Sequence, residues 1–413
     1  MHISLAWYIN HLAASTSWVW PRVPLDPGVR QIREARSFSV LSSVLSAVQR
    51  AICLVAQALL GLTLSAQAMA QGDGSGLKVS GSVDVVGSFK GNQYSTAPDR
   101  LDVREAEIML YGPIDHLFDG QLTLAAHPEQ GASVFEIHEA YVASSRLLPR
   151  TKFRIGQYFL GIGRLNHFHR HEWPFVSAPM IHRKLFGDEG VIDSGGELSW
   201  IAPLPFYVDL TAGVANGWVF GHTHDAGAKP RQPTHYTRLG SYSELPLDGG
   251  MQWGATLLRR MDAWGGSTFI AGVDLTAKWR EGSYLKWLVQ SEYWHRAQRI
   301  QQIGSDLGPT ESLQGMYLLV QHGMSQVWDV GLRGDWYGIP SMRDAFGSSL
   351  HYNEYGLTPT LTWRPSEFST WRLSSTYQVT RTESVTDAWR DRPRLGVEVQ
   401  TTFNFGAHPA HEF

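Results

Sequence analysis

The sequence predicts an all-β protein: a transmembrane antiparallel β-barrel of about sixteen strands, with a long third loop that could fold into the lumen. Polar and apolar side chains alternate with a period of two along most of the chain, as they do on the two faces of a strand. Glycine (41 residues) and aromatic residues (12 %) are frequent, and charged residues make up only 18 %. Short and long connections alternate, which is typical of outer-membrane barrels with aromatic girdles.

The first 70 residues have the pattern of a leader with a signal peptide. Arg50 precedes an apolar run, Ala51–Leu64, and Ala68-Met69-Ala70 fits the small-x-small cleavage pattern. We expect cleavage after Ala70 and a barrel formed by residues 71–413. The alternative is a retained helix, which the shortness of the apolar run disfavours. Residues 1–36 are long for such a leader and are either an overextended start or a poorly structured n-region.

Cysteine content and charge exclude two classes of function. The one cysteine, Cys53, lies in the leader, so residues 71–413 can hold neither a disulfide framework nor a cysteine metal site. The leader has five Arg against Asp26 and Glu34, a surplus of three positive charges. Because the whole chain carries −3, residues 71–413 carry −6. This acidic balance argues against nucleic acid as a partner.

Alternating segments bounded by turn residues define about sixteen candidate strands. These are residues 77–89, 101–112, 118–127, 133–146, 151–158, 190–202, 205–217, 235–245, 250–262, 267–279, 283–296, 311–322, 326–338, 350–364, 367–380 and 393–406. Short connections would be periplasmic turns and longer ones outer loops, which places both ends of the barrel in the periplasm.

The last candidate strand shows the two-sided pattern most clearly. One face carries Leu395, Val397, Val399, Phe403 and Phe405, interrupted by Thr401, whereas Glu398, Gln400 and Asn404 lie on the other. A soluble sandwich strand could show the same pattern. The position near the C-terminus, the aromatic end and the many similar segments favour a strand that closes a barrel, with the apolar face toward lipid.

The same alternation predicts which charged side chains line the lumen. In residues 327–336, for example, Trp328, Val330 and Leu332 would face lipid. The predicted lumen residues are Arg154, Asp274, Lys278, Lys286, Glu292, Asp329, Arg333, Asp335, Arg372 and Glu398. Rings of such charges set selectivity in pores.

The longest irregular segment, residues 159–189, mixes aromatic and charged side chains, and long loops in compact folds are usually functional. We expect it to narrow the pore, where Arg164, Arg170, Arg183 and Lys184 would attract anions. Three acidic residues would oppose them, namely Glu172, Asp188 and Glu189. The alternative is a solvated outer loop.

Histidines in this segment suggest a metal site. In an extended backbone the i, i+2, i+4 spacing of His167, His169 and His171 would place all three imidazoles on one face. With Glu172 or His182 they could bind zinc or copper, since imidazole suits both. Further candidates are His222 with His224, and His408 with His411. The alternative is surface histidines without metal, in which case the protein has no cofactor.

Enzyme motifs are missing from the sequence. Residues 71–413 contain no Gly-x-Ser-x-Gly, no phosphate-binding glycine loop and no His-Glu-x-x-His. We therefore expect no enzyme and no catalytic residues, although a Ser/His or Asp/His pair could assemble from distant strands.

Segments 101–111, 136–142 and 148–158, followed by 186–190, resemble the phosphate-selective porin family. In that family, strands with Arg-x-Ala, Asp/Glu-Ala-Tyr and Arg-Ile-Gly-Gln-Tyr/Phe precede a long loop. The resemblance covers roughly residues 77–215. It implies a sixteen-stranded homotrimeric porin whose third loop forms the constriction. A phosphate-selective pore carries a ladder of Arg and Lys, whereas the lumen predicted here mixes both signs of charge, so the resemblance does not extend to phosphate specificity.

The tail, residues 405–413, and the histidine-rich loop also resemble barrel proteins labelled zinc-regulated outer-membrane receptors of the TonB-dependent kind. Those receptors carry an N-terminal plug domain, for which the predicted strands leave no room. If zinc is involved, the resemblance implies a metal-linked porin.

The sequence thus favours a weakly selective porin of the bacterial outer membrane, surrounded by lipid and passing small hydrophilic solutes or ions. One alternative is a protein for zinc or metal uptake or binding. The other is a non-conducting barrel that acts as an adhesin or anchor.

Overall fold

The computed structural model describes residues 76–90, 101–129, 132–217, 230–301, 307–343, 349–383 and 390–406. The predicted leader, His222, His224, His408 and His411 lie outside these residues. Within them, no helix is long and apolar enough to cross a membrane.

Sixteen strands form the described part of the chain. They are β1 (Lys78–Lys90), β2 (Asp102–Pro113), β3 (Asp119–Glu129), β4 (Ala132–Ser144), β5 (Thr151–Phe159), β6 (Ile192–Ile201), β7 (Tyr207–Ala215), β8 (Gln232–Leu245), β9 (Gly249–Met261), β10 (Ser267–Glu281), β11 (Tyr284–Gln301), β12 (Leu307–Gly323), β13 (Trp328–Arg343), β14 (Ser349–Ser366), β15 (Ser369–Glu383) and β16 (Arg390–Gly406).

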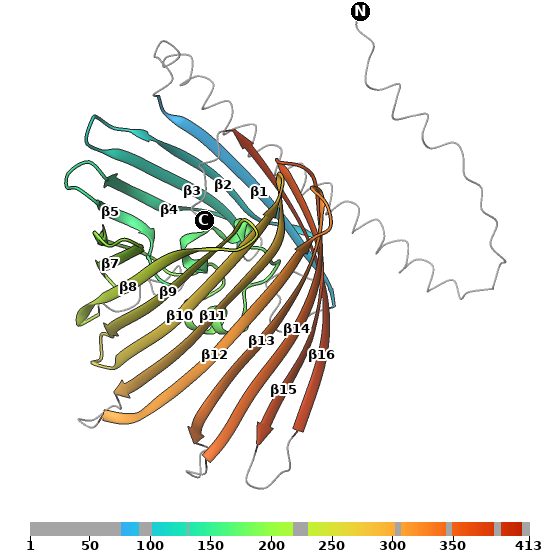
Figure 1. The fold of residues 1–413 in the computed structure, drawn as a ribbon. Coiled ribbons are helices and arrows are strands. Elements are labelled where there is room, and N and C mark those ends of the chain that lie inside the picture. Colours follow the sequence, from blue (N-terminus) through green and yellow to red (C-terminus); the bar gives the residue numbers. More distant parts are fainter. Residues whose placement is uncertain are drawn as a thin grey trace, which may run out of the picture. The chain divides into compact units, whose positions relative to one another are not determined.

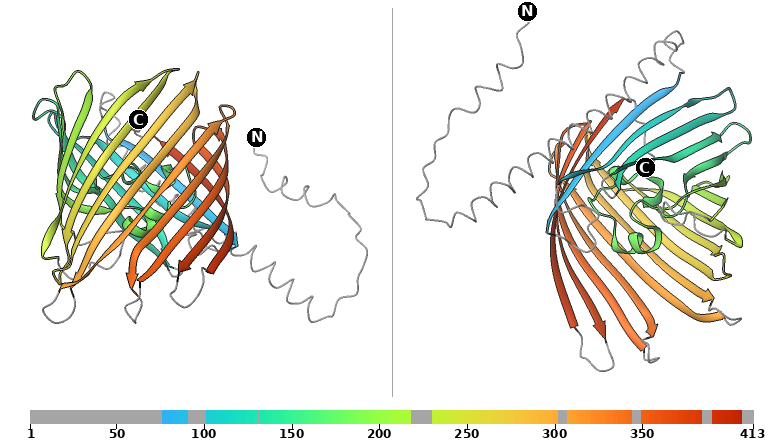
Figure 2. Two further views of the ribbon diagram at one scale, coloured as in Figure 1. Left: turned by 60° about the horizontal axis from the view of Figure 1, so that its bottom comes forward. Right: turned by 180° about the vertical axis from the view of Figure 1, so that it is seen from behind.

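These strands close into one antiparallel barrel in which each strand pairs with its neighbours in sequence (Figures 1 and 2). The register from Ser80↔Gly406 to Lys90↔Val397 joins β1 to β16 and leaves the sheet without an edge. The predicted fold class and the closing role of the last strand are confirmed.

Several strands are longer than predicted. The predicted connection from Ala297 to Thr310 is largely strand, because β11 runs to Gln301 and β12 starts at Leu307. Polar side chains such as Arg296, Gln298 and Arg299 occupy both faces there. The apolar alternation ends at this point although the backbone pairing continues.

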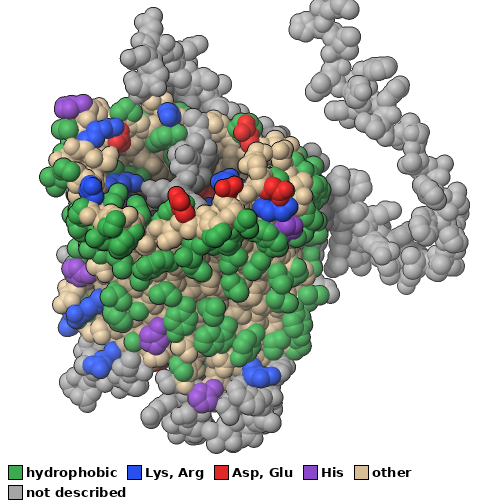
Figure 3. Space-filling view, viewed as in Figure 1, with side chains coloured by type: hydrophobic (Ala, Val, Ile, Leu, Met, Phe, Trp, Pro, Cys, Tyr) green, Lys and Arg blue, Asp and Glu red, His purple; other side chains and the backbone are tan. Residues whose placement is uncertain are grey.

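The outer face of the barrel is apolar (Figure 3). Side chains that alternation assigned to lipid are exposed, including Val273, Leu332 and Leu373. Near the short turns, aromatic rings on four adjacent strands form a row of neighbours. Ring centroids are 5.8 Å apart for Trp328–Trp363, 6.3 Å for Trp363–Trp371 and 5.9 Å for Trp371–Phe403. Aromatic belts of this kind mark the edge of the hydrocarbon layer.

The long connection between β5 and β6 lies inside the barrel (Figures 1 and 2). It contains two short 3₁₀ turns, η1 (Leu165–His167) and η2 (Arg170–Glu172), and the helix α3 (Met180–Phe186). The helix contacts β11, β12 and β13, on the far side of the lumen from β5. The prediction that this loop folds inward is confirmed, and the alternative of a solvated outer loop is wrong.

Candidate functional site

Hydrogen bonds from several strands hold the third loop, residues 160–191, across the lumen. At its start, the backbone N–H groups of Arg164 and Leu165 donate to Glu292 Oε1, the latter at 2.8 Å. Before α3, Ser177 Oγ donates to Glu398 Oε1 at 2.7 Å. The Met180 N–H donates to Asp335 Oδ1 at 3.1 Å. The loop is therefore fixed to β11, β13 and β16.

An apolar cluster adds to this anchoring. Leu160, Ile162, Trp173, Ile181 and Phe186 of the loop are buried with inward-facing side chains of the wall. The wall contributes Tyr158, Tyr236, Leu258, Ile270, Leu288, Trp294, Leu313, Tyr317, Leu319 and Tyr337. One side of the lumen is thus filled by packed apolar side chains, which the alternation of polar and apolar residues did not predict.

A cavity of about 570 Å³ remains beside the loop. It reaches residues next to the short turns, such as Ser145 and Arg150. Its lining carries charges of both signs: Arg150, Lys152, Arg154, Arg164, Arg238 and His169 against Glu139, Glu172, Glu197 and Asp209. A second cavity, of about 320 Å³, is lined by Arg170, Arg183, Gly187, Asp188 and Glu189 of the loop.

Most of the predicted lumen charges lie inside the barrel, either on the lining of a cavity or in contact with another side chain. Arg154 and Arg164 line the larger cavity, and Arg170 and Arg183 line the smaller one. Lys184 lies on α3, 5.4 Å from the ring centroid of Tyr337.

The remaining predicted charges lie in the wall. Their contacts are Asp274 with Arg238 (2.8 Å), Lys286 with Glu281 (2.6 Å), Asp329 with Arg364, Arg333 with Asp335 (2.8 Å) and Arg372 with Gln400 (2.8 Å). Lys278 is half-buried on β10, and Glu292 and Glu398 hold the loop as described above.

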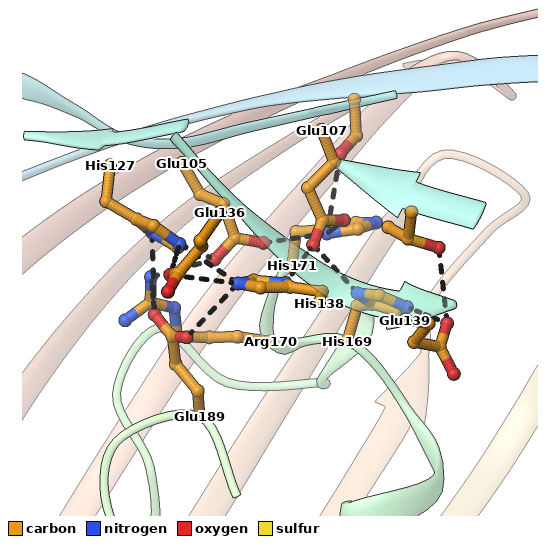
Figure 4. A network of polar contacts seen from close by, with 12 residues as sticks. Glu105, Glu107, His127, Glu136, His138, Glu139, His169, Arg170, His171 and Glu189 are labelled. Atoms are coloured by element: carbon orange, nitrogen blue, oxygen red, sulfur yellow. Dashed lines mark hydrogen bonds and ion pairs between the residues drawn. The ribbon is translucent and has the colours of Figure 1, made fainter. Parts of the chain in front are cut away.

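A cluster of histidines and glutamates joins the loop to β2, β3 and β4 (Figure 4). The wall provides Glu105, Glu107, His127, Glu136, His138 and Glu139, and the loop provides His169, Arg170, His171 and Glu189. Two sets of donor atoms within 4.8 Å of one another could hold a metal ion. They are Glu105, Glu107, His138 and His169, and His127, Glu136, His138 and Glu189.

Two register shifts build this cluster. Between β3 and β4 the pairing moves from Thr123↔Glu139 to Leu124↔Ile137, so His138 is an extra residue and both it and Glu139 are buried. Between β1 and β2 a similar shift makes Arg104 the extra residue beside buried Glu105. Bulges re-aim side chains in this way and are frequent next to functional sites.

The carboxylates change the protonation of the loop histidines. Burial disfavours the charged form of His171, but Glu107 and Glu105 outweigh it and raise its pKa to about 10. Burial also opposes charging of His169, and Glu107 and Glu139 raise its pKa well above the usual range. His169 Nδ1 lies 2.8 Å from Glu107 Oε1, and His171 Nδ1 lies 3.2 Å from Glu107 Oε2.

The structure separates the four histidines expected to act together. Because η1 and η2 replace an extended backbone, His167 is exposed and lines the larger cavity, whereas His169 and His171 are buried in the cluster. The prediction of one shared face is therefore wrong. His182 lies away from the cluster, edge-on to Trp173 and Phe186 at 5.1 and 5.3 Å.

Sequence reasoning missed the wall side of the cluster. Its signal was present as charged or histidine residues two apart on inward faces, Glu105-x-Glu107 and Glu136-x-His138. These residues lie in the segments that resemble phosphate-selective porins, and that resemblance does not point to a metal site.

No family model matches the chain. An uncharacterised protein of Aquifex aeolicus (strain VF5) is 29 % identical over 343 residues, which cover 76 % of this chain and 70 % of that protein.

Solved structures similar to this chain are outer-membrane proteins. An anion-selective porin from Comamonas acidovorans aligns with a TM-score of 0.53 and 11 % identity over 80 % of this chain and 99 % of its own. Outer-membrane-expressed OmpT of Vibrio cholerae aligns with a TM-score of 0.51 and 8 % identity over 81 % of this chain and 99 % of its own. The outer-membrane channel DcaP of Acinetobacter baumannii aligns with a TM-score of 0.50 and 10 % identity over 80 % of this chain and 96 % of its own. Likeness at such low identity concerns the fold, and the chain therefore has the sixteen-stranded barrel fold found in outer-membrane porins.

Proposed function

We propose that this protein is a bacterial outer-membrane porin through which small hydrophilic solutes or ions diffuse passively. The observation that carries the proposal is the third loop, which crosses a closed barrel and leaves polar cavities beside it. A loop held in this way narrows a pore and keeps its width constant, and the flow needs no covalent chemistry.

The outer wall supports a location in lipid. Apolar side chains cover it, and the aromatic row from Trp328 to Phe403 lies at one end. Export would use the leader, with cleavage after Ala70. We further propose a homotrimer, as one of the similar OmpT structures of Vibrio cholerae is described as a trimer form.

We propose weak selectivity. Five Arg or Lys side chains and His169 line the larger cavity together with four carboxylates, and fixed charges of opposite sign partly cancel the field that would favour one kind of ion. Phosphate specificity would need a ladder of cations, whereas Arg154 pairs with Glu197 at 2.7 Å and Arg238 with Asp274 at 2.8 Å. The resemblance to phosphate-selective porins therefore supports the barrel architecture and does not identify phosphate as the solute.

Recording from planar bilayers tests the proposal. Protein purified from outer membranes should give discrete conductance steps, and a salt gradient should give a reversal potential close to zero. A strong preference for anions would contradict weak selectivity and support the phosphate-porin resemblance.

The second candidate is a non-conducting barrel that serves as an adhesin or anchor. The apolar packing of the loop against β9–β13 favours it, because this packing fills one side of the lumen. Folded protein that inserts into bilayers but never shows steps would support the anchor and exclude the porin.

A further inference from the structure

Two imidazoles of the wall face one another beside the third loop. His127 on β3 and His138 on β4 have their Nε2 atoms 3.0 Å apart. Glu136 Oε1 lies 2.6 Å from His127 Nε2 and 3.4 Å from His138 Nε2. From the loop, Glu189 Oε2 lies 3.7 Å from His138 Nε2. Four donor atoms from three segments of the chain therefore converge on one point (Figure 4).

Their spacing suits a tetrahedral ion. Zinc binds imidazole nitrogen and carboxylate oxygen at about 2.0–2.2 Å, which puts neighbouring ligand atoms roughly 3.3 Å apart. The distances around His138 Nε2, from 3.0 to 3.7 Å, bracket this value. Two imidazoles with two carboxylates favour zinc and similar transition metals over Mg²⁺ and Ca²⁺, which prefer oxygen ligands alone.

The surroundings orient the ligands. His138 Nδ1 lies 2.9 Å from Glu107 Oε1, and a carboxylate at this nitrogen favours the tautomer whose Nε2 carries no proton and can bind a metal. The bulge at His138 aims its ring at this point. Arg170 binds the other oxygen of Glu189 at 2.6 Å, so that Oε2 is the oxygen on the side of His138.

The charge of the cluster also calls for a cation. Five carboxylates converge, and against them stand the guanidinium of Arg170 and the imidazoles of His169 and His171. The carboxylates are Glu105, Glu107, Glu136, Glu139 and Glu189. Protons cannot sit on both facing Nε2 atoms, because two N–H groups 3.0 Å apart would collide. A divalent ion at the same point satisfies both nitrogens and supplies two positive charges.

We propose that His127, Glu136, His138 and Glu189 bind one transition-metal ion of the zinc class and thereby fasten the end of the third loop to the barrel wall. This set differs from the histidine-only set that the sequence suggested. Glu136 is the ligand open to solvent, with 22 % of its side chain exposed, and it gives the ion a route to the site. The binding claim does not rest on the proposed porin function.

Zinc titration of the folded barrel tests the site. Full-length processed protein in detergent, treated with EDTA and dialysed, is titrated with Zn²⁺ by calorimetry and with Co²⁺ by visible absorption. We expect one equivalent of Zn²⁺ per chain and a tetrahedral Co²⁺ spectrum. His138→Gln should weaken binding by more than about 100-fold, and Glu107→Gln, which removes the carboxylate beside His138 Nδ1 and leaves all four ligands in place, by about 10- to 100-fold.

His167→Ala is the matched control, because His167 is a histidine of the third loop that lies outside the cluster. The affinity of this variant for Zn²⁺ should equal that of the wild type. Heat-modifiable mobility on gels confirms that each variant is folded, and Glu136→Gln provides a second ligand change at the exposed position. No binding by the folded wild type, or equal affinity in His138→Gln and the wild type, overturns the proposal. Because binding is measured in detergent, a barrel without conductance would refute the porin and leave this result intact.

Discussion

His182 lies in the apolar interior of the third loop, between Trp173 and Phe186. Burial lowers its pKa to about 3, whereas a histidine in the unfolded chain titrates near 6.5. Below about pH 6.5 the unfolded loop takes up a proton that the folded loop excludes. The contribution of His182 to loop stability is therefore complete above this pH and is lost as the pH falls toward 3.

We predict that hydrogen exchange in α3 becomes faster between pH 7.5 and about pH 5. His182→Leu, which keeps the site apolar and removes the titrating group, should reduce this acid-dependent increase. Exchange should be compared after correction for the intrinsic rate at each pH. An unchanged acid response in His182→Leu would show that other groups control the loop.

Gly163 is a second residue on which the loop depends. Its φ is +57°, and a Cβ would lie 2.5 Å from Trp294 Cζ2. An L-residue in this conformation costs about 1–2 kcal/mol before any clash, so Gly163→Ala should loosen the start of the loop and increase its proteolysis. The control is Gly196→Ala on β6, where the new methyl group meets no atom within 4 Å. Equal proteolysis of both variants would contradict this reading.

At the scale of elements, the position of α3 depends on hydrogen bonds to strand β13 of the barrel wall. The Met180 N–H donates to Asp335, which also accepts from Arg333 Nε, and Arg333 donates to Ser177 O at 2.7 Å. Removing a buried acceptor leaves its donors without a partner, at a cost of about 1–3 kcal/mol. Asp335→Ala should therefore release α3, which would appear as noisier or larger conductance steps.

Asp335→Asn is the matched control for this change. Its amide oxygen can still accept the bond from Met180, whereas its NH2 cannot accept from Arg333 Nε, so the loss of wild-type behaviour should be smaller than in Asp335→Ala. If both variants conduct like the wild type, this carboxylate does not hold the helix in place.

The strands of this barrel were predictable because lipid and water impose opposite demands on alternate side chains. In β13, Trp328, Val330 and Leu332 lie outside, and Asp329 and Arg333 lie inside, as their alternation requires. The ends of β11 and β12 were not predictable, since strand pairing beyond the apolar band needs no pattern of side chains. The bulge at His138 appears in the sequence only as two consecutive polar residues, His138 and Glu139, and which of them is the extra residue depends on the partner strand.

At the scale of the whole molecule, the sequence predicted an inward loop but not what the loop would meet. Inward residues such as Leu258 and Ile270 are apolar because the loop covers them. The histidine–glutamate cluster likewise needs the loop to fold back onto the paired strands β2, β3 and β4. Local spacing could place Glu107 and His138 on inward faces, whereas their meeting with His169 and His171 required the tertiary arrangement.

The balance of charge along the larger cavity leads to a prediction for the barrel as a pore. Lys152 is exposed on its lining, and Lys152→Gln would leave four Arg side chains and His169 facing four carboxylates. We expect the reversal potential in a salt gradient to shift toward cations, because the field inside a narrow channel follows the sum of its fixed charges. The shift should shrink at high salt, where screening shortens the reach of each charge.

Arg146→Gln is the control for this prediction, since it removes one positive charge outside the cavity lining. Arg146 is exposed near the β4–β5 turn and pairs with Asp119 at 3.2 Å, so its removal should move the reversal potential less. If both variants shift it equally, net charge of the barrel would set ion preference. If neither does, ions do not pass along this cavity, and the path would have to run on another side of the loop.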